Sequence, residues 1–410
     1  MTGRADSGSA LRHIAWMCAA HVVTMPGFGA YATLLPRLQQ EWETNNSQAG
    51  FVSGAFFAGY MAAVPLLAGL TDRVDARRVY LYSCLMLASA LGAFALLVQG
   101  FVTAALCQAA VGAGFAGTYM PGLRVLTDNT SGLAQSRAVS FYTAIFGLGT
   151  SVSIVVSALV ADAWGWRAAF AAAAFGPVIA AGMVRLGMPP SQLYPGHAAP
   201  LFDFRPVLRA RRVWPYILGY TVHCWELFGS RSWLVAYCFF AQGAQAAQAP
   251  GSASPWLWSP VAIAAIANLF GPPASIVGNE LAQKIGRGRL ITAAMIASGI
   301  LTGALGFSSH FPWFAIAGLA MLHMTLVMGD SSVLTAGMVI YSPSRARGVT
   351  MAVHSMLGFG AGFVSPLVFG AVLDLAGGNS SDAAWGAAFM TLGAGAVIAP
   401  WLLGFARRAR

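Results

Sequence analysis

The sequence predicts an all-α integral membrane protein with about twelve transmembrane helices, arranged as two pseudo-symmetric six-helix bundles. Three observations lead to this prediction. Asp, Glu, Lys and Arg make up only 9% of the 410 residues, against roughly 25% in a soluble domain. The mean hydropathy is +0.66. Apolar runs long enough to cross a bilayer recur along the chain, with short basic clusters between them.

The expected spans follow from the length that a membrane requires, about 20 mostly apolar residues per helix. The first half of the chain contains six such segments, near residues 13–36, 48–70, 78–98, 101–123, 136–160 and 166–188. The second half contains six more, near 213–240, 256–279, 289–308, 311–338, 347–374 and 384–405. We expect the first segment to be retained and not cleaved as a signal peptide, since no small-residue cleavage site follows it.

The proline-rich stretch between the two sets predicts a linker at residues 191–211, with an N-terminal bundle at 1–190 and a C-terminal bundle at 212–410. If the N-terminus is cytoplasmic, all of the 23 Lys and Arg except Arg37, Arg167 and Arg231 fall on the cytoplasmic side. Both termini and the linker are therefore expected in the cytoplasm. The composition, rich in Ala and Arg with a single lysine, suggests a bacterial inner membrane.

Composition also argues against several kinds of partner. The net charge of +10 is spread over many short loops, so no nucleic-acid partner is expected. The five cysteines lie in apolar runs without metal-ligand spacing, and neither a metal site nor a cofactor is predicted. Methionine and histidine do cluster at 321–328 and 351–356, where a Cu(I) path is a minor alternative to ordinary apolar packing.

The two halves of the chain resemble each other. A histidine and a following glycine coincide around His21 and His223, at an offset of 202 residues. The loop LTDRVDARR from Leu70 corresponds to LAQKIGRGR from Leu281, at an offset of 211. Because the two matches occur in the same order and in corresponding loops, they indicate an internal duplication.

The loop after the second span resembles the G-x-L-A-D-R-x-G-R-R pattern of the major facilitator superfamily. The matching residues are Leu70, Asp72, Arg73, Arg77 and Arg78, with Ala68 and Asp75 in place of the two glycines. The fourth span, QAAVGAGFAG, resembles the family's R-x-x-x-G-x-G pattern with Gln108 in place of arginine. The fifth span lacks G-x-x-x-G-P, which weakens an assignment as a drug–proton antiporter.

This resemblance implies a secondary transporter that works by alternating access, and it implies roles for several residues. The loop motif and its echo imply a conformational latch formed by Asp72, Arg73, Arg77, Lys284 and Arg287. The first, fourth, seventh and tenth spans are implied to line a central cavity. The polar residues that the first and fourth spans would add to it are His21, Thr24, Gln108 and Tyr119.

Only two of the 13 acidic residues, Glu226 and Asp330, are expected deep inside spans. A carboxylate at the bilayer centre costs at least about 2.5 kcal/mol, so such residues usually line an ion or substrate path. His223 lies three residues before Glu226 and His323 seven before Asp330, so each pair is expected to share a helix face. A desolvated carboxyl can exchange protons near neutral pH, and histidine can relay them.

Arg231 is the third deep charge, and three hypotheses remain open for it. Its planar guanidinium suits the carboxylate group of an anionic solute. It could instead form an ion pair across helices with Asp330 or Glu226. In the third hypothesis its side chain extends to the membrane interface.

The leading hypothesis from the sequence is a monomeric secondary transporter for a small anionic organic solute, coupled to protons through Glu226. One alternative is a proton-driven exporter of drugs or hydrophobic metabolites. Another is a membrane receptor or scaffold without transport. An enzyme is not expected, because the chain contains no H-E-x-x-H, G-x-S-x-G or phosphate-loop motif.

Overall fold

The computed structural model describes residues 7–71, 73–190, 204–248, 256–343 and 347–405, and within them the regular secondary structure is helical. The first half contains α1 (Ser7–Thr24), η1 (Met25–Gly27), α2 (Ala30–Trp42), α3 (Asn46–Leu70), α4 (Ala76–Leu97), α5 (Phe101–Asp128), α6 (Gly132–Trp164) and α7 (Trp166–Gly187). The second half contains α8 (Arg205–Arg209), α9 (Trp214–Gln248), η2 (Trp256–Trp258), α10 (Pro260–Leu269), α11 (Gly271–Ile285), α12 (Arg287–Gly306), α13 (Trp313–Met328), α14 (Ser331–Tyr341), α15 (Arg347–Leu375) and α16 (Asp382–Leu402). Part of the expected linker, residues 191–203, lies outside the described residues.

Eleven helical segments of the described chain are long and apolar enough to cross a membrane. The segment missing from this set is α9, which matches the expected seventh span and is 35 residues long. Its length is sufficient, but Glu226, Arg231 and His223 lower its apolarity. The expected integral membrane fold is thus confirmed, and its least apolar span is the one that carries two of the three deep charges.

Three expected spans are interrupted near their middles, which the continuous ranges 13–36, 256–279 and 311–338 did not anticipate. The first breaks at Met25–Gly27, where Pro26 cannot donate a backbone hydrogen bond. The second breaks at Phe270, directly before Gly271, and the third at Gly329 and Asp330. Broken helices leave backbone groups without helical partners, so in lipid they are tolerated where protein or a water-filled cavity surrounds them.

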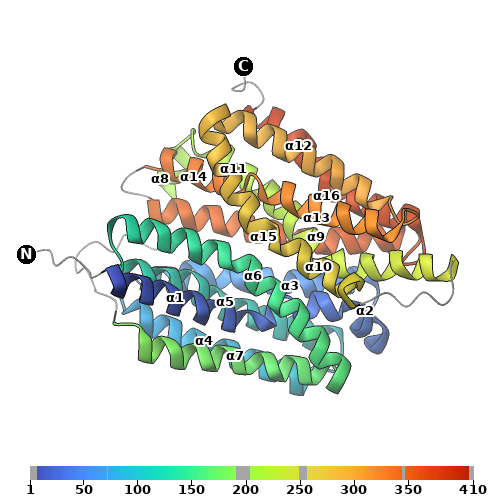
Figure 1. The fold of residues 1–410 in the computed structure, drawn as a ribbon, viewed down its shortest axis with the longest axis horizontal. Helices are drawn as coiled ribbons and strands as arrows, with labels where there is room; N and C mark the ends of the chain where they lie inside the picture. Colours follow the sequence, from blue (N-terminus) through green and yellow to red (C-terminus); the bar gives the residue numbers. More distant parts are fainter. Residues whose placement is uncertain (1–6, 72, 191–203, 249–255, 344–346, 406–410) are drawn as a thin grey trace, which may run out of the picture.

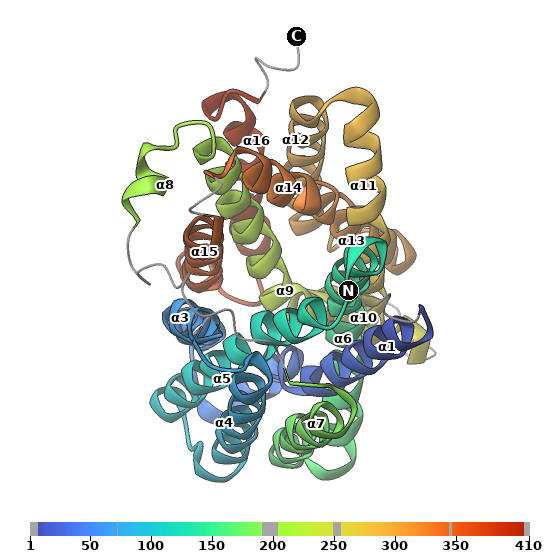
Figure 2. The same cartoon turned by 90° about the vertical axis from the view of Figure 1, so that its left-hand side faces the viewer.

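The helices form two groups, α1–α7 and α9–α16, which lie against each other along their lengths (Figures 1 and 2). We call the end that carries α8 and the start of α9 the linker end, and the opposite end the distal end. Helix α3 begins at the distal end, and α15 finishes there. The principal contacts between the groups are those of α3 with α15 and of α6 with α10.

The α3–α15 contact brings backbone against backbone. A Cβ atom at Gly50 would lie 2.1 Å from the carbonyl oxygen of Pro366, and one at Gly54 would lie 2.2 Å from that of Phe363. No side chain fits at these distances, so glycine is required for the two halves to approach this closely. Small residues have this role in helix packing within lipid, where close van der Waals contact replaces the hydrophobic effect.

The buried apolar side chains of the described residues form three clusters, and their distribution differs between the two ends. One large cluster includes Phe57 of α3, Phe228 of α9 and Phe369 of α15, and so joins both halves through the middle and the distal end. At the linker end each half has a cluster of its own. The N-terminal one contains Tyr142, and the C-terminal one contains Leu334.

Candidate functional site

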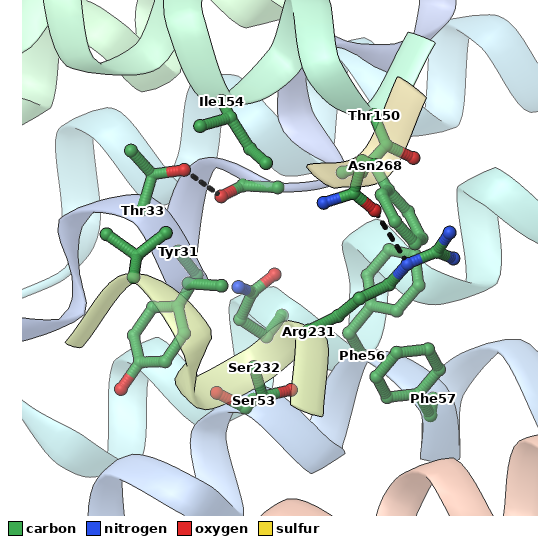
Figure 3. Close-up of a pocket in the computed structure, with 15 residues that line it drawn as sticks. Tyr31, Thr33, Ser53, Phe56, Phe57, Thr150, Ile154, Arg231, Ser232 and Asn268 are labelled. Atoms are coloured by element: carbon green, nitrogen blue, oxygen red, sulfur yellow. Dashed lines mark hydrogen bonds between the residues drawn. The ribbon is translucent and has the colours of Figure 1, made fainter. Parts of the chain in front are cut away.

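A cavity of about 50 Å³ lies between the two halves (Figure 3), next to the breaks in α1–α2 and α10–α11. Its side chains come from α2, α3, α5, α6, α9 and α10. The lining residues are Phe28, Gly29, Tyr31, Ala32, Thr33, Ser53, Phe56, Phe57, Gln108, Thr150, Ile154, Arg231, Ser232, Val235 and Asn268. Aromatic and aliphatic groups form much of this wall, and Arg231 is the one charged residue among the described residues that line it.

Asn268 fixes the position of the Arg231 guanidinium (Figure 3). The Arg231 Nε donates a hydrogen bond of 2.9 Å to Asn268 Oδ1. The Asn268 amide nitrogen in turn donates to the Ala264 carbonyl at 2.9 Å, and this bond orients the amide oxygen toward the arginine. Asn268 is 2% exposed, so its amide is held inside the protein. The guanidinium also lies 5.9 Å from the ring centroid of Phe146.

Arg231 therefore does not form the ion pair that one of the three hypotheses proposed. Among the described residues, no carboxylate lies within 4.0 Å of its guanidinium, and neither Nη forms a hydrogen bond. The side chain points into the cavity between the two halves. Of the three hypotheses, this geometry is compatible with the binding of an anionic group.

Glu226 is buried within the C-terminal half and lies outside the cavity wall. Its carboxylate is 2% exposed and accepts two hydrogen bonds from α12. Ser298 Oγ donates to Oε2 at 2.9 Å, and Thr302 Oγ1 donates to Oε1 at 2.6 Å. The two hydroxyl residues are four apart on α12, so they reach the same carboxylate from one helix face.

The two histidine–carboxylate pairs expected along single helices are not formed in that way. His223 Nδ1 contacts Asp330 Oδ1 at 2.8 Å, which joins α9 to the break before α14. His323 instead lies between Thr302 and Ser230, at 3.1 and 3.0 Å. The expected tenth span is broken between His323 and Asp330, since α13 ends at Met328 and α14 begins at Ser331. Both side chains still face α9, because their partners Ser230 and His223 are seven residues apart on that helix.

The predicted polar residues of the N-terminal half occupy two places. Gln108 lines the cavity. His21 instead stacks on Tyr142 with ring centroids 4.6 Å apart, and Tyr119 lies 5.3 Å away. Thr24 donates to the His21 carbonyl at 2.7 Å. Both ring nitrogens of His21 lack a hydrogen-bond partner among the described residues, although the side chain is fully buried.

The residues of the predicted latch lie at the linker end. Asp72 falls outside the described residues. Arg77 donates to the Met188 carbonyl at 2.8 Å and thereby binds the end of α7, while Arg73 is exposed. In the second half Lys284 is exposed and Arg287 is half-buried. The latch role of these five residues therefore remains a prediction.

Sequence reasoning missed several residues of these sites, above all Asn268, Ser298 and Thr302. Asn268 had a weak signal, as an amide inside an apolar run. Ser298 and Thr302 had the i, i+4 spacing of neighbours on one face. A hydroxyl in a transmembrane helix usually bonds its own backbone, as Thr302 also does with the Ser298 carbonyl, so its presence alone does not indicate a site.

Asp374, at the distal end of α15, forms a further polar contact between the halves. Its Oδ1 accepts hydrogen bonds from the backbone and side-chain nitrogens of Asn46, at 3.1 and 2.8 Å. Its Oδ2 accepts from the backbone nitrogen and hydroxyl of Ser47, at 2.8 and 2.7 Å. These groups form the first turn of α3, where unpaired N–H groups and the helix dipole favour a negative charge.

Comparison of the sequence with known families gives one match that covers most of the chain. The model of the Major Facilitator Superfamily matches residues 17–366. Protein spinster homolog 3 of Danio rerio is 24% identical over 156 residues, which is 38% of this chain and 31% of that protein. The chain thus spans about a third of the curated relative that it matches.

Solved structures agree with the fold over nearly the whole chain. A bacterial homologue of the human lysosomal transporter Spinster, in an inward-facing and occupied conformation, has a TM-score of 0.73 at 15% identity, over 98% of this chain and 97% of its own. The nucleoside transporter NupG has a TM-score of 0.73 at 15% identity, over 96% and 99%. The human organic anion transporter TETRAN has a TM-score of 0.64 at 16% identity, over 96% and 99%.

Proposed function

Because the chain belongs to the major facilitator superfamily, we propose that it is a secondary transporter that moves a small organic anion by alternating access, coupled to protons. The two bundles, with proposed bounds 1–190 and 212–410, would rock about the cavity between them. We place the protein in a bacterial inner membrane as a monomer, with its termini and linker in the cytoplasm, and we propose no enzymatic activity and no nucleic-acid partner.

One observation carries the anionic part of the proposal. Arg231 lines the cavity with both Nη groups unpaired among the described residues, and Asn268 holds its guanidinium in place. A half-buried charge inside the protein without a charged partner is costly, and a carboxylate that accepts from both Nη groups would supply one. The aromatic side chains Phe28, Phe56 and Phe57 suit an organic body attached to that carboxylate.

The proton part of the proposal rests on Glu226. Its carboxylate is buried in the C-terminal half, hydrogen-bonded to hydroxyls and not opposed by a cation among the described residues. Such a group is stabilised by binding a proton, and proton exchange at intramembrane carboxylates is how many transporters couple to a proton gradient. Glu226 lies on α9, the helix that also carries Arg231.

Thermal stability of the purified chain tests the solute class. We expect monocarboxylates to raise the Tm, and amino acids, inorganic anions, Cu(I) and lipophilic cations to raise it less. Arg231→Gln removes the charge-assisted hydrogen bonds, worth about 1.5–3 kcal/mol, and should weaken carboxylate binding roughly 10- to 150-fold. Arg231→Lys should restore it only in part, because lysine lacks the planar fork.

Arg167 offers a matched control. This arginine is exposed in the first turn of α7, and its Nη groups donate to the Ala95 and Val98 carbonyls at 2.9 Å, away from the cavity. Arg167→Gln should lower the Tm of the free protein and leave the shift caused by carboxylate intact. Stabilisation by lipophilic cations alone, or a carboxylate shift that survives Arg231→Gln, would refute the anion site and favour an exporter of hydrophobic compounds.

Proton flux in liposomes tests the coupling. The carboxylate that stabilises the protein best is applied outside, and the internal pH is followed. Glu226→Gln should abolish solute-driven proton movement and retain solute exchange at equal concentrations on both sides. Coupling that is unchanged in Glu226→Gln would eliminate Glu226 as the proton carrier.

A further inference from the structure

A continuous chain of hydrogen bonds connects Glu226 to the helix face beside Arg231. Thr302 Oγ1 lies 2.6 Å from Glu226 Oε1 and 3.1 Å from His323 Nδ1. His323 Nε2 lies 3.0 Å from Ser230 Oγ. The members come from α9, α12 and α13, and each is at most 2% exposed. Three helices therefore converge on one buried polar path.

The donors and acceptors of this chain can be ordered from its charged end. The Glu226 carboxylate can only accept, so the Thr302 hydroxyl donates to it. The Thr302 oxygen is then free to accept from His323 Nδ1–H. A neutral imidazole with its proton on Nδ1 accepts at Nε2, and the Ser230 hydroxyl fills that position. One arrangement of protons thus satisfies every group.

Thr302 has two acceptors within reach of its single proton. Besides Glu226, its hydroxyl lies 2.8 Å from the Ser298 backbone carbonyl. When Glu226 is charged, the hydroxyl donates to the carboxylate. When Glu226 is protonated, its own O–H can donate to Thr302, and the threonine proton turns to the Ser298 carbonyl. The hydroxyl can therefore reverse its direction without movement of the backbone.

We infer that Thr302 and His323 form a proton relay that connects Glu226 to the anion site at Arg231, with Ser230 as its other end. This inference rests on the proposed function and adds two residues to it, Thr302 and Ser230, that the family resemblance does not indicate. Both ends of the relay lie on α9, and Ser230 is the residue directly before Arg231, which lines the cavity. The other ionisable groups near this path are the His223–Asp330 pair and Arg231 itself.

The transfer balances as a shift of each proton by one position. A hydronium ion on the cavity side gives a proton to Ser230 Oγ and becomes water, and the original serine proton passes to His323 Nε2. The Nδ1 proton of His323 moves to Thr302 Oγ1, and the threonine proton moves to Glu226 Oε1. Ser230, His323 and Thr302 each end with the number of protons with which they began. Glu226 has gained one, and release follows the same steps in reverse.

Infrared spectroscopy of the full chain in lipid nanodiscs tests the relay without a solute. After a pH jump, the carboxyl C=O band that disappears in Glu226→Gln reports protonation of Glu226. Thr302→Val keeps the shape of the side chain and removes its hydroxyl. The Glu226 C=O band should therefore appear at least about tenfold more slowly after the pH jump, and its final amplitude should be unchanged. Thr302→Ser should retain the wild-type rate, because the hydroxyl remains.

Thr118→Val is the matched control. Thr118 is also fully buried in a helix, but its hydroxyl bonds only its own helix, at the Phe115 carbonyl. The Thr118→Val substitution should leave the rate at which the Glu226 band appears unchanged. If Thr302→Val does not fold, His323→Gln interrupts the same path and should slow the appearance of the Glu226 band in the same way.

The outcomes separate the two proposals. A wild-type rate in Thr302→Val or in a folded His323→Gln would overturn the relay, as would a Thr302→Ser variant as slow as Thr302→Val. Slowing by Thr118→Val would also overturn it, because the effect would then be one of packing. If no C=O band is lost in Glu226→Gln, the proton carrier of the proposed function fails. A band that is lost in Glu226→Gln and unaffected by the relay variants refutes the relay alone.

Discussion

The two ends of the molecule differ in how the halves meet. At the distal end and through the middle, one apolar core includes side chains from both halves, and backbone contacts at Gly50 and Gly54 hold α3 against α15. Asp374 adds four hydrogen bonds across the same contact. At the linker end each half has its own core.

This difference shows where the molecule can open at least cost. Separation at the linker end leaves each local core intact. Separation at the distal end exposes apolar surface from a shared core and breaks the bonds of Asp374. Opening of the distal end therefore requires an interaction that offsets these losses, and a bound solute or proton that favours one arrangement can provide it. In the alternating-access cycle that we propose, the distal contacts would contribute to the energy difference between the two states.

Gly50→Val should alter this balance most. Its Cβ would lie 2.1 Å from the Pro366 carbonyl oxygen, which is backbone and cannot move aside alone. Overpacking of about 1–3 kcal/mol would shift the equilibrium toward a distal-open state by roughly 5- to 150-fold. Spin labels on exposed Leu97 and Leu375, in a background without native cysteines, should show a longer distance.

Labels at the linker end provide the comparison for this variant. Leu186 and Leu402 are exposed there, and their distance should shorten or stay constant as the distal distance grows. Gly92→Val controls for the added side chain, because a Cβ at Gly92 meets nothing within 4 Å. A distal distance that is the same in Gly50→Val and the wild type would show that the α3–α15 contact does not determine closure.

Asp374→Asn should have the next largest effect. The amide keeps one acceptor but turns an NH₂ group toward the N–H donors of Asn46 and Ser47, and it loses the charge that favours the start of α3. Because Asp374 is only half-buried, we expect the free-energy difference between the two states to change by about 1–2 kcal/mol in favour of distal opening. The Leu97–Leu375 label pair measures it.

Asp382→Asn is the matched control for this charge. Asp382 also lies at the distal end, but it contacts Ser309 and His310 within its own half. The same loss of charge there should leave the distance between the halves unchanged. Equal shifts in the two variants would mean that net charge at the distal end matters and the contact with α3 does not.

Much of the fold could be predicted because lipid imposes a simple requirement on every span. The expected span 48–70 corresponds to Asn46–Leu70, and 166–188 corresponds to Trp166–Gly187. The breaks at Pro26 and Gly329 could not be predicted in the same way. Glycine and proline are common in unbroken transmembrane helices, so only the surrounding packing decides which of them interrupts the backbone.

The candidate site was predictable in its charges and not in its partners. Glu226 and Arg231 were found because charges inside spans are rare. Their partners Thr302 and Asn268 depend on how α9 is rotated against α12 and α10, and that rotation is set by packing between helices. Asp374 was not among the acidic residues expected deep inside spans, and its contact could not be predicted because its partners Asn46 and Ser47 are more than 300 residues away in the sequence.

The smallest expected effect concerns Ser151, whose hydroxyl donates to the Ala265 carbonyl at 2.7 Å and so joins α6 to α10 across the halves. Ser151→Ala removes one hydrogen bond, worth about 0.5–1.5 kcal/mol, and should lengthen the distal distance in only a small fraction of molecules. Ser153→Ala is its control, because that hydroxyl lies two residues further along α6 and bonds within its own half. It donates to the Pro26 carbonyl and accepts from the Gly29 backbone nitrogen. We expect Ser153→Ala to lower the Tm without a change in the distal distance. If both variants changed it equally, small losses anywhere in α6 would open the molecule, and closure could not be ascribed to the contacts between the halves.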